Sequence, residues 1–101
     1  MDSVPLTGAQ KTALRGRGQR LPDGVLAGRG GVTPALVAEI DRQLAGHELV
    51  KLRFTGGQDR HERAALCAAI AASARAQCVG AVGHTALFWR PGPGGSKLLS
   101  A

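Results

Sequence analysis

The strongest hydrophobic pattern in the chain is a helical stripe in its middle third. Apolar side chains recur there at intervals of three and four residues, at Val37, Ile40 and Leu44. Thr33 and Pro34 precede the stripe. A threonine hydroxyl can accept a hydrogen bond from a first-turn N–H group, and proline at the first helical position sacrifices no hydrogen bond. The pattern predicts a helix that starts at Pro34, and Gly46 is the residue expected to end it.

A second pattern lies in the stretch from Glu48 to Thr55, where apolar and basic residues alternate from Val50 to Phe54. The apolar positions are Val50, Leu52 and Phe54. Lys51 and Arg53 lie between them and point the other way. Because successive side chains of a strand face opposite sides of a sheet, this stretch predicts a half-buried strand with a basic outer face.

Shorter patterns predict the remaining elements. In chain order they are a helix from Thr7 to about Arg17, a strand at Val25–Ala27, a helix from Asp59 to about Ala74, and strands at Cys78–Val82 and Thr85–Trp89. Asp59 and Glu62 have the spacing of a capping box. Gly83 and His84 separate the last two strands, and glycine in first place suits a two-residue hairpin turn.

The order of these elements predicts the fold class. Helix, strand, helix, strand, helix, strand, strand indicates an α/β fold with a mixed four-stranded sheet and packed helices. Two strand–helix–strand crossovers make the first three strands parallel, and the final hairpin adds an antiparallel strand. We expect residues 1–5 to form an N-terminal tail, residues 6–91 a single domain, and the Pro- and Gly-rich residues 92–101 a flexible C-terminal tail.

Composition adds a class of partner. The 101 residues contain 13 Lys and Arg against 7 Asp and Glu, a formal net charge of +6, which suits a polyanion. No apolar run approaches the roughly 18 residues of a membrane span, and the N-terminus lacks the apolar core of a signal peptide. We therefore expect a cytoplasmic protein with no membrane partner. Its two cysteines form no disulfide framework.

The basic residues that are candidates for phosphate binding gather in two places. Five of them fall within the first 31 residues: Lys11, Arg15, Arg17, Arg20 and Arg29. Lys51 and Arg53 add a second group on the outer face of the predicted strand. A run of charges is usually only a solvated surface, and that explanation is strong for Arg42, which has acidic neighbours.

A glycine-rich segment, Gly28-Arg29-Gly30-Gly31, joins a predicted strand to a predicted helix start. Glycine lets a backbone approach a ligand closely, and a helix N-terminus offers unpaired N–H groups with partial positive charge. Together these features predict a phosphate seat. The alternative is a simple turn that needs a positive φ. The spacing fits neither a P-loop nor a dinucleotide fingerprint, but a GxxG loop can clamp a nucleic-acid backbone.

Motifs for catalysis and metal binding are incomplete. His61 and Glu62 begin an HExxH pattern that ends on alanine, so a second metal ligand is missing. Cys67 and Cys78 lie in apolar runs and are expected to be core thiols. We expect no catalytic residue, no metal and no cofactor.

Two neighbouring aromatic residues near the end of the chain are a further candidate for RNA contact. Phe88 and Trp89 have the flat rings that stack on bases. The competing interpretation follows from strand alternation, which sends one of them into the core and leaves the other partly exposed.

Several segments, at consistent spacing, resemble a known family. They are Leu6-Thr7 with Gln10-Lys11 and Leu14-Arg15, the stretch from Gly28 to Thr33, His47 to Lys51, and Gly83 to Pro91. In this combination the chain resembles the CRM domain (chloroplast RNA splicing and ribosome maturation), of the bacterial stand-alone YhbY type. It departs from the pattern at Arg75, where the family usually has a glycine, and at Trp89, where tyrosine is usual.

The resemblance implies a fold similar to the C-terminal domain of translation initiation factor 3, and RNA binding through the glycine loop. It also implies a partner among ribosomal RNA or large-subunit precursor particles. The hypothesis is a non-catalytic, monomeric RNA-binding protein of ribosome assembly. Its proposed contacts are Gly28, Arg29, Gly30, Gly31, Lys11, Arg15, Arg17, Arg20, Lys51 and Arg53. A small phosphate- or nucleotide-binding enzyme that uses the same loop, and a protein-interaction module on the ribosome, stay open as alternatives.

Overall fold

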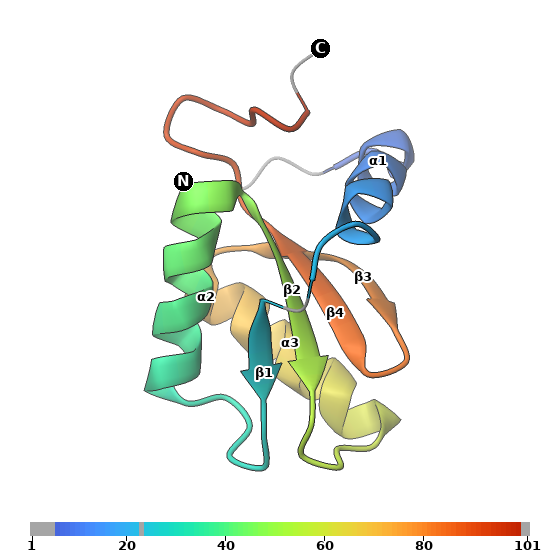
Figure 1. Cartoon of the computed structure of the whole chain (residues 1–101), viewed down its shortest axis with the longest axis vertical. Coiled ribbons are helices and arrows are strands. Elements are labelled where there is room, and N and C mark those ends of the chain that lie inside the picture. The colour runs from blue at the N-terminus through green and yellow to red at the C-terminus, as the bar shows by residue number, and fades with distance from the viewer. Residues whose placement is uncertain (1–5, 23, 100–101) are drawn as a thin grey trace.

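The computed structural model describes residues 6–22 and 24–99. Their elements follow the expected order (Figure 1): α1 Gly8–Gly18, β1 Val25–Ala27, α2 Pro34–His47, β2 Leu49–Phe54, α3 Arg60–Ala74, β3 Gln77–Val82 and β4 Thr85–Trp89. The predicted α-β-α-β-α-β-β sequence is therefore confirmed. Within the described part of the chain, no helix has the length and apolar character needed to cross a membrane.

The four strands form one mixed sheet in the order β1-β2-β4-β3. β1 pairs in parallel with β2, with Val25 opposite Leu52 and Ala27 opposite Phe54. β4 runs antiparallel to both of its neighbours, so β1, β2 and β3 point in one direction, as predicted. The tight hairpin at Gly83, whose φ is 57°, makes β3 and β4 neighbours, and β3 is left at the edge of the sheet.

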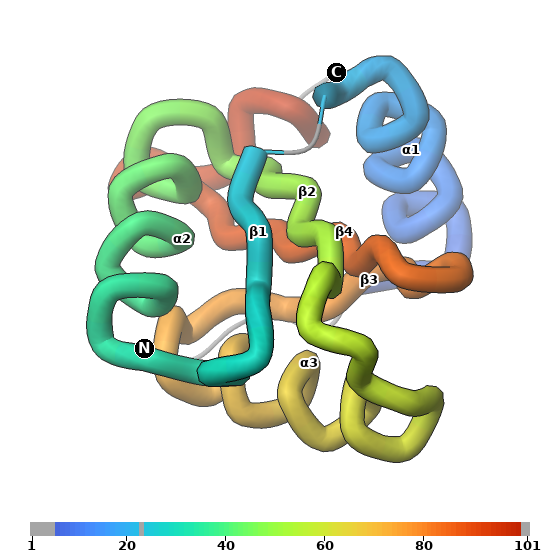
Figure 2. Tube along the Cα trace, turned by 60° about the horizontal axis from the view of Figure 1, so that its bottom comes forward, coloured from blue at the N-terminus to red at the C-terminus, as the bar shows by residue number. Residues whose placement is uncertain are grey.

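Helices cover both faces of the sheet (Figure 1 and Figure 2). α2 and α3 pack on one face, and α1 lies on the other. The larger core lies beneath α2 and α3 and includes Ile40, Leu52, Ile70 and Phe88. The smaller core lies beneath α1 and includes Leu14, Leu49, Leu87 and Trp89. The side of the sheet that carries α1 is called the α1 side below.

Because each face is covered, the two neighbouring aromatic residues of β4 are both buried. Phe88 is 0% exposed in the larger core, and Trp89 is 4% exposed in the smaller one. The expectation that one of them would stay partly exposed is wrong, because it assumed that one face of the sheet was open. Phe54 is also buried, so none of the chain's Phe and Trp side chains is available to stack on a base.

Local sequence signals explain where the helices start. Thr7 forms a complete capping box with Gln10 at α1, and Asp59 forms one with Glu62 at α3. At α2 the Thr33 hydroxyl accepts a hydrogen bond from a first-turn N–H group at 3.1 Å. Each cap satisfies donors that the first turn of a helix would otherwise leave unpaired.

The ends of the helices follow the signals less closely. α2 continues through Gly46 to His47, and the residue that turns left-handed is Glu48, with φ of 66°. The expected stop at Gly46 is therefore wrong, because β2 begins at Leu49 and the change of direction falls immediately before it. α3 ends where predicted, although Arg75 takes the left-handed conformation (φ 54°) that glycine adopts more easily.

Hydrogen bonds hold Glu48 in its unusual position. It is the one buried charged residue among residues 6–22 and 24–99, at 7% exposure. Its carboxylate accepts hydrogen bonds from the Trp89 indole at 3.2 Å, from the Ser96 hydroxyl at 2.6 Å and from the Lys97 N–H group. Leu98 and Leu99, which follow Lys97 in the chain, pack on the smaller core. Residues 92–99 are thus folded back on the domain, and the flexibility of this segment stays a prediction.

Candidate nucleic-acid interface

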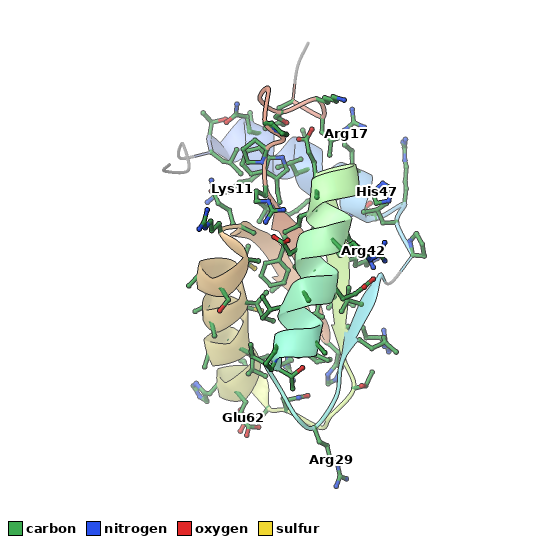
Figure 3. All side chains as sticks on the ribbon, turned by 90° about the vertical axis from the view of Figure 1, so that its left-hand side faces the viewer. Lys11, Arg17, Arg29, Arg42, His47 and Glu62 are labelled. Carbon is green, nitrogen blue, oxygen red and sulfur yellow. The ribbon has the colours of Figure 1, made fainter. Side chains whose placement is uncertain are left out.

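The glycine segment forms a tight turn at one end of the sheet, called the 28–31 loop below. The Gly31 N–H group donates to the Gly28 carbonyl at 3.1 Å. Gly31 has φ of 65°, so this glycine is required by the turn itself. Arg29 occupies the tip, and its side chain points away from the domain (Figure 3).

A second loop, residues 55–58 after β2, supports the 28–31 loop from behind. A Cβ atom on Gly56 would lie 2.6 Å from the Arg29 nitrogen and from the Gly28 carbonyl carbon, so the two backbones are in direct contact. The Gln58 side chain donates to the Gly28 carbonyl at 2.8 Å and accepts from the Gly56 N–H group at 3.1 Å. Arg63 in turn donates to the Gln58 carbonyl at 2.6 Å. These contacts hold the loop in place without occupying its outer surface.

Two glycines of the loop are not explained by the fold. Gly28 and Gly30 lack the positive φ found at Gly31. A Cβ atom on Gly28 would meet only the Thr55 hydroxyl at 4.0 Å, and one on Gly30 would meet a Thr33 methyl at 3.4 Å. Both distances are ordinary van der Waals contacts, so a side chain would fit at either position. The bare backbone there leaves room for something outside the domain.

The electrostatic setting of the loop favours an anion. The loop follows the carboxyl end of β1 and precedes the N-terminus of α2, whose first turn contains no acidic residue. α3 starts at the same end of the sheet, but Asp59 and Glu62 already occupy its N-terminus. The N–H group of Gly30 has no acceptor among the residues that the structure describes. A helix N-terminus with an unused N–H group is a common phosphate site.

The predicted basic residues do not form one patch. Figure 3 shows Lys11 and Arg17 at the opposite end of the molecule from Arg29. Arg15 and Arg20 belong to the first of these ends, on α1 and the turn that follows it. The five basic residues of the first 31 therefore do not form one basic region, because β1 and the residues between α1 and β1 separate the α1 group from the loop.

Lys51 and Arg53 lie between the two ends, on the α1 side of the sheet. Their register partners on β4 are Leu87 and Thr85. The Lys51 ammonium donates to the Leu21 carbonyl at 3.4 Å, beneath the turn that follows α1. The basic residues therefore form a discontinuous track along the α1 side, from the helix to the 28–31 loop.

The described acidic residues are engaged in ion pairs, helix caps or buried hydrogen bonds. Glu39 pairs with Arg42, and the hydrogen bond from Arg42 lowers the pKa of Glu39 to about 2. Asp41 pairs with Arg90 at 2.6 Å. The other three are the buried Glu48 and the two α3 capping residues. No carboxylate of the described residues belongs to α1 or to a strand.

Candidate sites for other chemistry are weak. No group of three or more His, Cys, Asp or Glu residues that could hold a metal occurs in the described ranges. Cys67 is buried as expected, but Cys78 is exposed, because β3 is an edge strand. A hydrogen bond from the Cys67 thiol lowers the pKa of Cys78 to about 7, and the same contact together with burial raises the pKa of Cys67.

Sequence reasoning missed the residues that support the loop. Neither Gly56 nor Gln58 is among the residues that the sequence predicts for the site. A pair of glycines directly after a strand was the available signal, because glycine there often marks the close approach of another backbone. Only the parallel pairing of β1 with β2 identifies which backbone approaches.

Comparison with known proteins identifies the family of the chain. The sequence profile of the CRS1 / YhbY (CRM) domain matches residues 6–90. A protein of Pseudomonas aeruginosa named "Probable RNA-binding protein" is 33% identical over 97 residues, which cover 96% of this chain and 92% of the relative. A Haemophilus influenzae protein named "RNA-binding protein" is 34% identical over 86 residues, which cover 85% and 86%. A "Probable RNA-binding protein" of Methanocaldococcus jannaschii is 30% identical over 99 residues, covering 94% and 71%.

A solved structure shares the fold. The solution structure of a hypothetical protein from Staphylococcus aureus matches with a TM-score of 0.75 at 24% identity, covering 85% of this chain and 88% of that one. It confirms the predicted α/β class with three helices and a mixed four-stranded sheet. The profile match extends over nearly all of the described residues, and the chain therefore belongs to the CRS1 / YhbY (CRM) domain family.

Proposed function

We propose that this chain is a non-catalytic RNA-binding protein that holds the RNA backbone at the 28–31 loop. The observation that carries the proposal is the loop itself. Gly28 and Gly30 are bare where the fold has room for side chains, and they precede a helix N-terminus without acidic residues. The names of the bacterial and archaeal relatives point to the same class of ligand.

In the proposed mechanism, the loop and the basic track act at different ranges. The cations of α1 and β2 attract the phosphate chain over a distance of about one Debye length, roughly 8–10 Å at physiological salt. At the loop, a phosphate then accepts a hydrogen bond from the Gly30 N–H group, and the Arg29 guanidinium binds a phosphate oxygen. Glycine backbone makes this close approach possible.

Ribosomal RNA in precursors of the large subunit is the partner that we propose, with the protein acting in the cytoplasm as a monomer. The family resemblance supports this assignment. Because phosphate contacts carry no sequence information, selection of the site would depend on RNA shape rather than on base identity at the loop.

Arg29→Glu tests the role of the loop. Arg29 makes no hydrogen bond or ion pair within the described residues, so the substitution leaves the fold intact. We expect a large loss of affinity for a ribosomal RNA fragment, measured by filter binding at fixed salt. Arg75→Glu is the matched control, with the same change of charge at the far end of α3 from the loop. Equal affinity of the Arg29→Glu variant and the wild type would contradict the loop assignment.

A further inference from the structure

We propose that the α1 side of the sheet binds unpaired nucleotides of the RNA, an inference that rests on the proposed function. One unstacked base would lie in the hollow between α1 and the β3–β4 hairpin. The 28–31 loop accounts for phosphate. This second surface would account for bases, in a domain whose Phe and Trp side chains are all buried.

Strand register defines the exposed part of this surface. One row of side chains crosses the entire sheet, in the spatial order Leu26, Arg53, Thr85 and Val82. Leu26 and Val82 are 60% and 78% exposed, and they are the only large hydrophobic side chains that the described residues expose. α1 lies over the other end of the sheet and leaves this row uncovered (Figure 1). The row begins two residues before Gly28, so it is continuous with the proposed phosphate seat.

The next row forms the floor of a hollow. Lys51, Leu87 and Gly80 follow one another across β2, β4 and β3. Between this row and α1 lies a hollow of about 300 Å³, with Arg15 and Gly18 on the helix side and Val82 at its mouth. This volume is at the lower limit of small-molecule sites, roughly 300–1,000 Å³. Such a hollow suits one small planar group.

Glycine shapes the hollow on both walls. A Cβ atom on Gly80 would lie 3.0 Å from the Cγ and Cδ atoms of Arg15, so the arginine stem lies flat along β3. A Cβ atom on Gly18 would lie 2.6 Å from a Leu87 methyl, so α1 approaches the sheet closely here. The hollow thus has an aliphatic floor and a guanidinium along one wall. Guanidinium planes stack on bases in single-stranded RNA.

Charge identifies the occupant. Arg15 and Lys51 flank the apolar floor from opposite sides, and no described carboxylate belongs to α1 or to the sheet. An apolar floor between two cations matches a nucleotide, whose base is flat and whose phosphate is negative. The bases of a duplex stay stacked and paired and cannot enter such a hollow. The geometry therefore favours single-stranded segments, loops or bulges over regular helices.

The test compares RNA ligands on the full-length protein by fluorescence anisotropy. The ligands are a short unpaired RNA, the same RNA with abasic riboses, and a hairpin of equal charge. The abasic RNA should bind about five- to a hundredfold more weakly than the intact strand, as expected when base stacking is lost. The hairpin should also bind more weakly than the unpaired strand.

Two variants locate the effect on the protein. Gly80→Leu fills the hollow and displaces Arg15, while Gly46→Leu is the matched control, because a Cβ atom on Gly46 would meet nothing within 4 Å. Val82→Glu places a carboxylate on the exposed row without touching the core, and Ala69→Glu makes the same change on the exposed surface of α3. Both test variants should weaken binding of the unpaired RNA at least fivefold, with binding by the controls unchanged.

The outcomes separate this proposal from the proposed function. If the wild type binds RNA but intact and abasic strands bind equally, or if both test variants bind like their controls, the base-binding surface is refuted while the loop assignment stands. If the wild type binds none of the three RNAs, both proposals fail. Val82→Glu remains informative if Gly80→Leu does not fold, because residue 82 is exposed.

Discussion

Replacing Glu48 by glutamine tests whether a buried carboxylate ties the C-terminal segment to the domain. Trp89 and Ser96 donate to one carboxylate oxygen, and the Lys97 N–H group donates to the other. Glutamine has nearly the same shape and leaves the left-handed backbone unchanged. Its NH₂ group donates instead of accepting, so at least one donor loses its acceptor whichever way the amide is turned.

The size of the effect follows from these contacts. A hydrogen bond to a charged group contributes about 1.5–3 kcal/mol, and a buried donor without an acceptor costs about 1–3 kcal/mol. We expect Glu48→Gln to lower the free energy of unfolding by about 2–4 kcal/mol, a substantial part of the roughly 5–15 kcal/mol of a typical domain. Burial alone would raise the pKa of Glu48, but the hydrogen bonds from Ser96, Lys97 and Trp89 outweigh it and lower the pKa.

The lowered pKa fixes the sign of the pH dependence. The stabilisation by Glu48 is fully present above the unfolded carboxyl pKa of about 4.3, and it is lost as pH falls through the folded value. Urea unfolding, followed by circular dichroism and by the fluorescence of the single tryptophan, should show a gap between wild type and variant at neutral pH that narrows in acid. Glu39→Gln, on an exposed ion pair, is the control and should have the smaller effect at neutral pH. Equal urea midpoints at neutral pH, or a gap that does not narrow in acid, would refute the reasoning.

Three further predictions concern the loop and the thiols. Gly31→Ala should lower stability by about 1–2 kcal/mol, because φ is positive there, whereas Gly30→Ala should leave the urea midpoint unchanged and weaken RNA binding. An aromatic disulfide reagent should modify Cys78 in the folded protein, with a half-maximal rate near pH 7, and should modify Cys67 only after unfolding. Equal rates of modification of the two thiols in the folded protein would contradict the assigned pKa directions. RNA affinity should fall with salt, and Arg29→Glu should reduce the log–log slope by about 0.7, while an unchanged slope would remove Arg29 from the phosphate contacts.

Features that depend on neighbours in sequence were predictable. The caps at Thr7, Thr33 and Asp59 need only a side chain and an N–H group three residues later, so their spacing is visible in the chain. The alternation of β2 is equally local, and its burial pattern follows it. The direction of the first three strands was also predictable, because a short helical crossover returns the chain parallel to its starting strand.

Features that depend on what covers a segment were not predictable in the same way. Sequence alternation places Phe88 and Trp89 on opposite faces, but it does not tell whether a helix covers each face. α1 supplies the second cover, and its contact with the sheet joins residues far apart in the chain. Cys78 is the reverse case. Its apolar neighbours suggested burial, but its strand lies at the edge of the sheet, which only strand order reveals.

The same distinction applies to the candidate site. The 28–31 loop was identifiable because glycines, arginine and the helix cap are adjacent in the chain. The basic residues were identifiable one by one, but their grouping was not. Lys11 and Arg29 lie at opposite ends of the molecule, although they fall within the same 31 residues (Figure 3). Conversely, Arg15 and Lys51 are distant in sequence and line the same hollow.

The charge of the α1 side arises as much from where the acids lie as from where the cations lie. The five described carboxylates cap α3, pair with Arg42 and Arg90, or are buried at Glu48. Each therefore has a structural partner within the domain. A net charge of +6 spread evenly would give a weak field in every direction. None of the five belongs to α1 or to a strand, so the cations of these elements dominate the field on the side that carries the exposed row and the hollow, and this is the side from which a phosphate chain would be drawn in.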